Sequence, residues 1–117
     1  MTASDDSKPS ELTADIIARL YATILSRQDG DAAKSYVASL LQKGKPTIAR
    51  KVGEEAIETV VAALGDDRES LIAESADLLF HLMVLWVDAG IRPAEVFQEL
   101  ARREGFSGHE EKSRRKE

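Results

Sequence analysis

Apolar residues recur every three or four positions along most of this chain, which is the spacing of helices that pack through one face. The pattern predicts a first helix over residues 11–28, capped by Ser10, and a second over residues 32–43. Between them, residues 29–31 read Asp-Gly-Asp and favour a turn. No stretch alternates apolar and polar positions as a half-buried strand would.

Prolines and glycines divide the remaining apolar segments into three further helices. A third helix is expected over residues 46–64, with a proline in its first turn and a glycine after its end. The spacing of Asp66 and Glu69 is that of a capping box, which predicts a fourth helix over residues 66–89. A fifth helix is expected over residues 93–104, again between a proline and a glycine.

The predicted fold class is all-α. We expect an antiparallel bundle of about five helices, because the connections between them are short. The chain has 117 residues, enough for one domain, which we assign to residues 11–104. Residues 1–10 are polar and are expected to form a disordered lead, and residues 105–117 a polar C-terminal tail.

The fourth predicted helix is apolar around most of its circumference, which requires burial on nearly every side. A chain of this size, with four other helices, can hardly surround it completely. We therefore expect homodimerisation to complete the core. The apolar positions are Leu71, Ile72, Leu78, Leu79, Phe80, Leu82, Met83, Val84, Leu85, Trp86 and Val87.

Charge and composition disfavour several classes of partner. The net charge of −5 and the pI of about 5.1 oppose binding to the phosphates of nucleic acid or of anionic membranes, so neither is an expected partner. The absence of cysteine excludes disulfides and thiolate metal sites. The apolar run at residues 78–87 is too short to cross a bilayer, and no secretory signal is evident, so a cytoplasmic location is expected.

Five carboxylates form two short clusters inside these apolar segments. Within each cluster the spacing places the carboxylates on one helix face, so two antiparallel helices would direct all five towards one small volume. Crowded negative charges repel one another and are costly to bury unless a cation lies among them. The carboxylates are Glu54, Glu55 and Glu58 in the third predicted helix, and Glu74 and Asp77 in the fourth.

Oxygen ligands of this kind suit Mg²⁺, which proteins bind through a few carboxylates together with substrate phosphates. We therefore predict a Mg²⁺ site for phosphate chemistry, in which a carboxylate free of the metal could act as general base. Basic residues just upstream are candidates for holding the rest of a phosphate chain. These are Lys43, Lys45, Arg50 and Lys51.

A simpler interpretation remains open for part of the cluster. Glu54 and Glu55 each follow a basic residue by four positions, so both could form ordinary solvated salt bridges. The other three carboxylates have no lysine or arginine three or four residues away, so surface pairing does not explain them. His81 is expected to pack in the core or to hydrogen-bond Asp77, four residues earlier, rather than to bind a metal.

Two segments carry a resemblance to known proteins. Residues 51–58 read KVGEEAIE and residues 74–82 read ESADLLFHL, and they contain the ExxE and ExxD motifs of the all-α nucleotide pyrophosphohydrolases. Together with the turn around Gly65 and the GFSG sequence at residues 105–108, they resemble the phosphoribosyl-ATP pyrophosphatase family of histidine biosynthesis. The resemblance extends from about Leu12 through the tail.

The resemblance implies Mg²⁺-dependent hydrolysis of phosphoribosyl-ATP to phosphoribosyl-AMP and pyrophosphate, with water attacking between the α and β phosphorus atoms. It implies catalytic roles for the carboxylates of the two motifs, and a metal-binding role for the same four together with Glu54. It also implies a homodimer, as the apolar fourth helix does. The motif carboxylates are Glu55, Glu58, Glu74 and Asp77.

Two alternatives stay open. A housekeeping pyrophosphatase for non-standard nucleoside triphosphates would use the same carboxylates with a different base pocket. A non-catalytic helical dimerisation module would tolerate neutralisation of Glu58 or Asp77 without loss of function.

Overall fold

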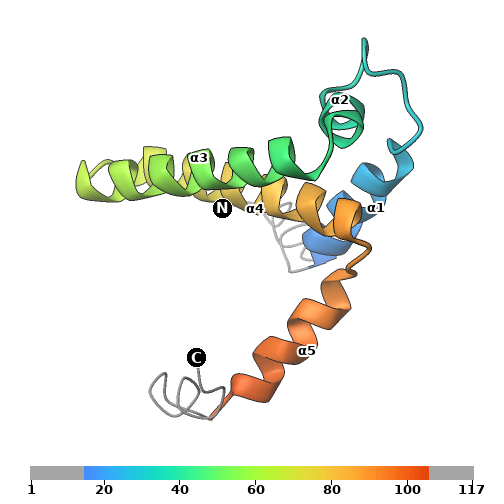
Figure 1. Ribbon diagram of the computed structural model, residues 1–117. Helices are drawn as coiled ribbons and strands as arrows, with labels where there is room; N and C mark the ends of the chain where they lie inside the picture. The colour runs from blue at the N-terminus through green and yellow to red at the C-terminus, as the bar shows by residue number, and fades with distance from the viewer. Residues whose placement is uncertain (1–14, 106–117) are drawn as a thin grey trace, which may run out of the picture.

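The computed structural model describes residues 15–105, and within this range the chain forms five helices and no strand (Figure 1). The all-α prediction is confirmed. The helices are α1 (Asp15–Ser26), α2 (Tyr36–Lys43), α3 (Lys45–Leu64), α4 (Arg68–Ala89) and α5 (Pro93–Arg103).

Helices α3 and α4 form a long antiparallel hairpin, and they make the most extensive helix pair of the fold. Figure 1 shows α1 and α2 at one end of this hairpin, next to the C-terminal half of α4, while the α3–α4 turn projects at the opposite end. Helix α5 leads away from the hairpin and packs only against α1 among the larger helix contacts. The half of the hairpin that contains the α3–α4 turn therefore projects as a two-helix arm. The arm consists of the C-terminal half of α3 and the N-terminal half of α4.

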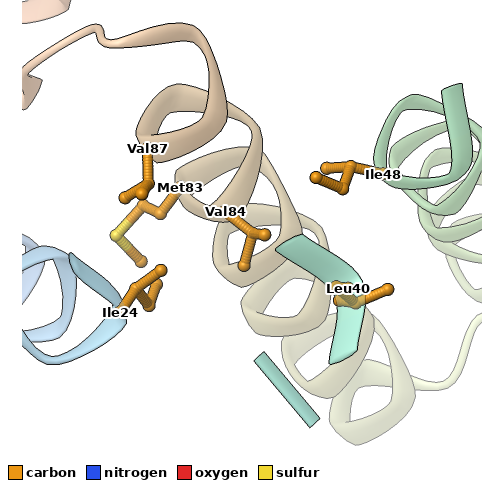
Figure 2. Close-up of a cluster of buried hydrophobic side chains, with 6 residues drawn as sticks. All are labelled: Ile24, Leu40, Ile48, Met83, Val84 and Val87. Atoms are coloured by element: carbon orange, nitrogen blue, oxygen red, sulfur yellow. The ribbon is translucent and has the colours of Figure 1, made fainter. Parts of the chain in front are cut away.

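The hydrophobic core lies at the base of the hairpin, where four helices meet (Figure 2). Figure 2 shows Met83 and Val87 pointing towards Ile24, whereas Val84 lies on the side that faces α2 and α3. Burial of such side chains contributes about 1.5–3 kcal/mol each, which fixes α1 and α2 against the hairpin. The buried residues of this cluster are Ile24, Leu40, Ile48, Met83, Val84 and Val87.

The start of α2 differs from the prediction. The helix begins at Tyr36 rather than at residue 32, and residues 32–34 form a turn. Ser35 is the N-cap: its backbone is extended, and its hydroxyl oxygen accepts a hydrogen bond of 3.1 Å from the Ala38 N–H. The cap places Tyr36 at the first helical position.

The predicted capping box of Asp66 and Glu69 is wrong by one residue. Asp66 has a φ of 61°, a left-handed conformation that belongs to the turn. Asp67 is the N-cap of α4, and its carboxylate accepts hydrogen bonds from the backbone N–H groups of Glu69 and Ser70. The hydrogen bonds from Ser70, followed by that from Glu69, lower the pKa of the Asp67 carboxyl group below its ordinary value.

The other helix ends agree with the predictions to within two residues where the structure describes them. Gly90, at a φ of 73°, ends α4 in the left-handed conformation typical of a glycine cap. The start of the first helix at residues 11–14, its Ser10 cap, the lead at residues 1–10 and the tail beyond Gly105 lie outside the described residues.

In the single chain, α4 is more exposed than is expected of a helix with so many apolar residues. Ile72 and Leu79 are 56% and 46% exposed, and the fully buried positions of α4 lie between His81 and Val87. By length and apolar content alone, α4 could cross a bilayer, but the core helix of a soluble protein passes the same test. The apolar surface left open on the arm requires another explanation.

Candidate metal and phosphate site

Three carboxylates meet between the two helices of the arm. Glu55 and Glu58 lie one turn apart on α3, and Glu74 faces them from α4. One oxygen atom from each of the three lies within 4.8 Å of the others. The antiparallel hairpin therefore brings the ExxE motif and the first residue of the ExxD motif together.

Thr59 fixes the register of the two helices at this point. Its hydroxyl lies 2.8 Å from the Glu55 carbonyl oxygen, one turn earlier on α3, and 3.3 Å from the Glu74 carbonyl oxygen on α4. The single hydroxyl hydrogen can be shared between these two acceptors. Thr59 is not among the site residues predicted from the sequence, although a threonine inside a helix can bond back to the carbonyl oxygen four residues earlier.

Glu55 is the most buried of the three carboxylates, with only 6% of its surface exposed. Its Oε2 atom lies 3.6 Å from the ammonium nitrogen of Lys51, but its Oε1 atom is buried and has no hydrogen-bond partner among the described residues. The Oε1 atom of Glu74 is likewise buried and has no hydrogen-bond partner among the described residues. Buried oxygen atoms without partners are costly, and a cation held between the three carboxylates could supply the missing partner.

The electrostatics of the site agree with this interpretation. The pKa of the Glu74 carboxyl group is raised, first by its removal from water, then by a hydrogen bond with Glu58 and by the charges of Glu58, Glu55 and Asp77. Without a cation, Glu74 therefore takes up a proton at a higher pH than an ordinary glutamate. A divalent cation among them would oppose this shift, because it favours the ionised form.

The raised pKa of Glu74 makes the metal-free fold less stable as the pH rises. The stability linked to its protonated form is complete below the ordinary pKa of 4.5 and is lost as the pH rises through the higher folded value. We expect the difference in melting temperature between wild type and Glu74→Gln to change over this window, with the variant gaining relative stability as the pH rises. A difference in melting temperature between the two proteins that stays constant over this pH range would contradict the expectation.

Glu54 and Asp77 lie outside the group of three. Glu54 is half exposed and pairs with Arg50 at 3.8 Å and with Lys51 at 3.5 Å, as the simpler interpretation expects, and its role as a metal ligand stays a prediction. Asp77 is exposed and lies one turn after Glu74, where its charge contributes to the raised pKa of Glu74. The structure thus brings together Glu55, Glu58 and Glu74, with Asp77 at their edge.

The four predicted phosphate-binding residues occupy different places. Lys51 lies beside the carboxylates, and Arg50 is exposed on the preceding position of α3. Lys45 pairs with Asp88 at 3.3 Å. Lys45 is about 15 Å along α3 from Glu55, at a rise of about 1.5 Å per residue. Lys43 is exposed in the last turn of α2.

His81 is buried one turn beyond Asp77 and uses both ring nitrogens. Its Nδ1 atom lies 2.8 Å from the main-chain carbonyl oxygen of Asp77, and its Nε2 atom lies 2.8 Å from the Tyr36 hydroxyl. The predicted hydrogen bond between His81 and Asp77 is confirmed, through the backbone of Asp77. The contact between Tyr36 and His81 was not predicted from the sequence, because nothing local connects the start of α2 with α4.

A hollow of about 280 Å³ lies next to the carboxylates and is lined by residues of both α3 and α4. Glu58, Ser70 and Glu74 form its polar wall, and Val61 and Ala62 of α3 form its apolar wall. The site therefore has a neighbouring space that part of a substrate could occupy.

Comparison with known proteins gives consistent matches. Residues 17–104 match the profile of the phosphoribosyl-ATP pyrophosphohydrolase family. A phosphoribosyl-ATP pyrophosphatase of Azospirillum brasilense is 52% identical over 91% of this chain and 96% of its own length. Those of Paramagnetospirillum magneticum and Novosphingobium aromaticivorans are 54% and 57% identical, each over 86% of this chain and over 92% and 94% of their own lengths.

Proposed function

Because the chain belongs to the phosphoribosyl-ATP pyrophosphohydrolase family, we propose that Glu55, Glu58 and Glu74 bind Mg²⁺ for its reaction. The chain is a hydrolase of histidine biosynthesis that converts phosphoribosyl-ATP and water into phosphoribosyl-AMP and pyrophosphate. The observation that carries the metal proposal is the buried Oε1 atom of Glu55, which has no partner among residues 15–105. A cytoplasmic location stays a prediction.

The ligand chemistry favours Mg²⁺ over softer metals. The three converging groups are all carboxylates, and hard cations such as Mg²⁺ prefer oxygen ligands. When bound, Mg²⁺ neutralises phosphate charge and activates water for attack on phosphorus. Asp77 is proposed as a fourth ligand or as a neighbouring base, and Glu54 is left to its two salt bridges.

The other residues of the site can bind and orient the substrate. Lys51 lies 3.6 Å from Glu55, and Arg50 precedes it on α3 and pairs with Glu54. We assign to both residues the contacts with the phosphates. The hollow next to Glu58 and Glu74 offers Val61 and Ala62 as an apolar wall for a sugar or base. A carboxylate that the cation leaves free can take the proton of the attacking water.

The proposal predicts strict substrate and metal preferences. The purified chain should hydrolyse phosphoribosyl-ATP with Mg²⁺ at least about a hundredfold more efficiently than ATP or non-standard nucleoside triphosphates. Chelation with EDTA should abolish turnover, and added Mg²⁺ should restore it. Pyrophosphate release in a coupled assay measures both. Preference for a plain triphosphate would support the housekeeping pyrophosphatase instead, and full activity in EDTA would contradict the metal proposal.

We also propose that two copies of the chain pair through their arms. The outer face of α3 carries an apolar stripe at the spacing of one helix face, and all four residues are more than half exposed. Exposed apolar surface of this kind marks an interaction site, and a second copy is the partner that the incompletely covered α4 also requires. The arm stripe consists of Ile57, Val60, Val61 and Leu64.

Gly53 supports this proposal. It lies inside α3, one turn before Ile57, where a glycine costs about 1 kcal/mol relative to alanine. A Cβ atom at this position would meet nothing within 4 Å in the single chain, so no intramolecular contact requires a glycine. A partner helix that packs closely along the arm stripe would require one.

A further inference from the structure

Thr59 joins the main chains of two of the three converging glutamates. A carbonyl oxygen can only accept, so the Thr59 hydroxyl must donate, to the Glu55 carbonyl oxygen at 2.8 Å and to the Glu74 carbonyl oxygen at 3.3 Å. The first bond stays within α3 and the second crosses to α4. One half-buried hydroxyl therefore spans the two helices where their carboxylates meet.

Few other polar interactions join the two helices. In the part of the chain that the structure describes, the bond from Thr59 to Glu74 is the one hydrogen bond between α3 and α4, and Lys45–Asp88 is the one ion pair between them. Lys45 begins α3 at the base of the hairpin, about 20 Å along the helix from Thr59. The ion pair therefore cannot set the gap between the helices at the carboxylates.

Apolar packing also constrains this gap less than it constrains the base of the hairpin. Within residues 15–105, α3 has no fully buried apolar side chain after Ile48, and α4 has none before Met83. Glu55 is the buried residue of α3 at the level of the site. The hydroxyl of Thr59 is consequently the main specific contact that fixes the separation of the helices there.

This separation matters because it selects the size of the bound cation. Two oxygen atoms on one Mg²⁺ lie at most about 4.2 Å apart, twice the bond length, whereas the longer bonds to Ca²⁺ allow up to about 5.2 Å. One oxygen atom from each of Glu55, Glu58 and Glu74 lies within 4.8 Å of the others. Mg²⁺ also requires near-octahedral geometry, while Ca²⁺ accepts irregular arrangements. A slightly wider gap would therefore weaken Mg²⁺ binding more than Ca²⁺ binding.

We propose that Thr59 is a positioning residue that holds α3 and α4 at the separation that Mg²⁺ requires, and so favours Mg²⁺ over Ca²⁺ at the carboxylates. The inference rests on the proposed function, since it takes the carboxylates as the metal ligands. Thr59 acts through Glu55 and Glu74, and we assign it no contact with the metal or the substrate.

The test compares Thr59→Val with Thr59→Ser and uses Thr23→Val as a matched control. Valine has the shape of threonine without its hydroxyl, whereas serine keeps the hydroxyl. Thr23 on α1 makes the same kind of bond, at 3.1 Å to the Arg19 carbonyl oxygen four residues earlier, and no hydrogen bond from its hydroxyl to another described helix. Each valine variant therefore loses a bond within its own helix, but only Thr59→Val loses a bond between helices.

Calorimetry with Mg²⁺ alone and with Ca²⁺ alone measures the effect without turnover. We expect Thr59→Val to weaken Mg²⁺ binding at least about tenfold, the usual loss when a group that orients metal ligands is removed. Ca²⁺ binding should weaken less than about threefold, because its longer bonds tolerate the wider gap. Thr59→Ser and Thr23→Val should stay within about threefold of the wild type for both ions.

The dependence of activity on Mg²⁺ distinguishes positioning from a part in the chemical step. The kcat of Thr59→Val should return to within about threefold of the wild type at saturating Mg²⁺, while the concentration for half activity rises about tenfold. Thermal melts in EDTA establish that each variant folds. If Thr59→Val does not melt cooperatively, Thr59→Ala replaces it, with the same expected loss of Mg²⁺ binding.

Three results would overturn the proposal: unchanged Mg²⁺ binding in the folded variant, equal weakening of Mg²⁺ and Ca²⁺, or a kcat that stays low at saturating Mg²⁺. Failure of the proposed function looks different. A wild type that binds Mg²⁺ but does not hydrolyse phosphoribosyl-ATP would defeat the proposed reaction alone. A wild type that hydrolyses it, beside a Thr59→Val protein that binds Mg²⁺ equally well, would defeat the role of Thr59 alone.

Discussion

Glu55→Gln should reduce kcat by about a thousandfold or more, because it removes one ligand charge from the centre of the site, and metal ions supply several kcal/mol to such reactions. The metal-free protein should lose no stability, since the substitution keeps the shape of a side chain that is 6% exposed and removes its buried charge. Mg²⁺ should raise the melting temperature of the wild type and not that of the variant. Steady-state kinetics and thermal melts with and without Mg²⁺ measure these effects.

Glu54→Gln is the matched control, at the next position of the same helix. The Glu54 side chain is 49% exposed and makes only salt bridges of the kind that contributes little. We expect its activity to stay within about threefold of the wild type and its response to Mg²⁺ to be unchanged. Equal losses in the two variants would show that total negative charge matters, and not ligation by Glu55.

The carboxylate site was predictable from the sequence because local rules place its parts. Helical spacing puts Glu55 and Glu58 on one face, and a short turn between two long helices requires an antiparallel return that brings Glu74 opposite them. The same rules gave the five helices and most of their ends. Lack of basic neighbours correctly separated Glu58 and Glu74 from ordinary salt bridges.

Features that depend on contacts between helices could not be predicted in this way. Glu54 and Glu55 are adjacent, and only the rotation of α3 against α4 decides that Glu55 is buried and Glu54 exposed. The hydrogen bond between Tyr36 and His81 joins residues 45 positions apart, which no spacing rule reaches. The cap of α4 moved to Asp67 because Asp66 took the left-handed turn position, a choice between two neighbouring aspartates.

Val60→Asp should convert a dimer of this chain into a monomer. Val60 lies at the centre of the arm stripe and is 56% exposed in the single chain. Burial of four such side chains from each copy would contribute about 1.5–3 kcal/mol per side chain, and an unpaired buried carboxylate would cost several kcal/mol. We expect at least a hundredfold weaker dimerisation, measured by sedimentation equilibrium, and a melting temperature that no longer rises with protein concentration.

Leu25→Asp provides the control, because it places the same charge on an apolar residue of α1 that is 45% exposed and is not part of the arm stripe. This variant should remain dimeric. Since Ile57 of the stripe and Glu58 of the site are neighbours on α3, a partner arm would come to lie beside the carboxylates, and turnover per chain should fall as the dimer fraction falls. A wild-type protein that is monomeric at micromolar concentration, or a Val60→Asp dimer as tight as the wild type, would exclude the arm as the interface.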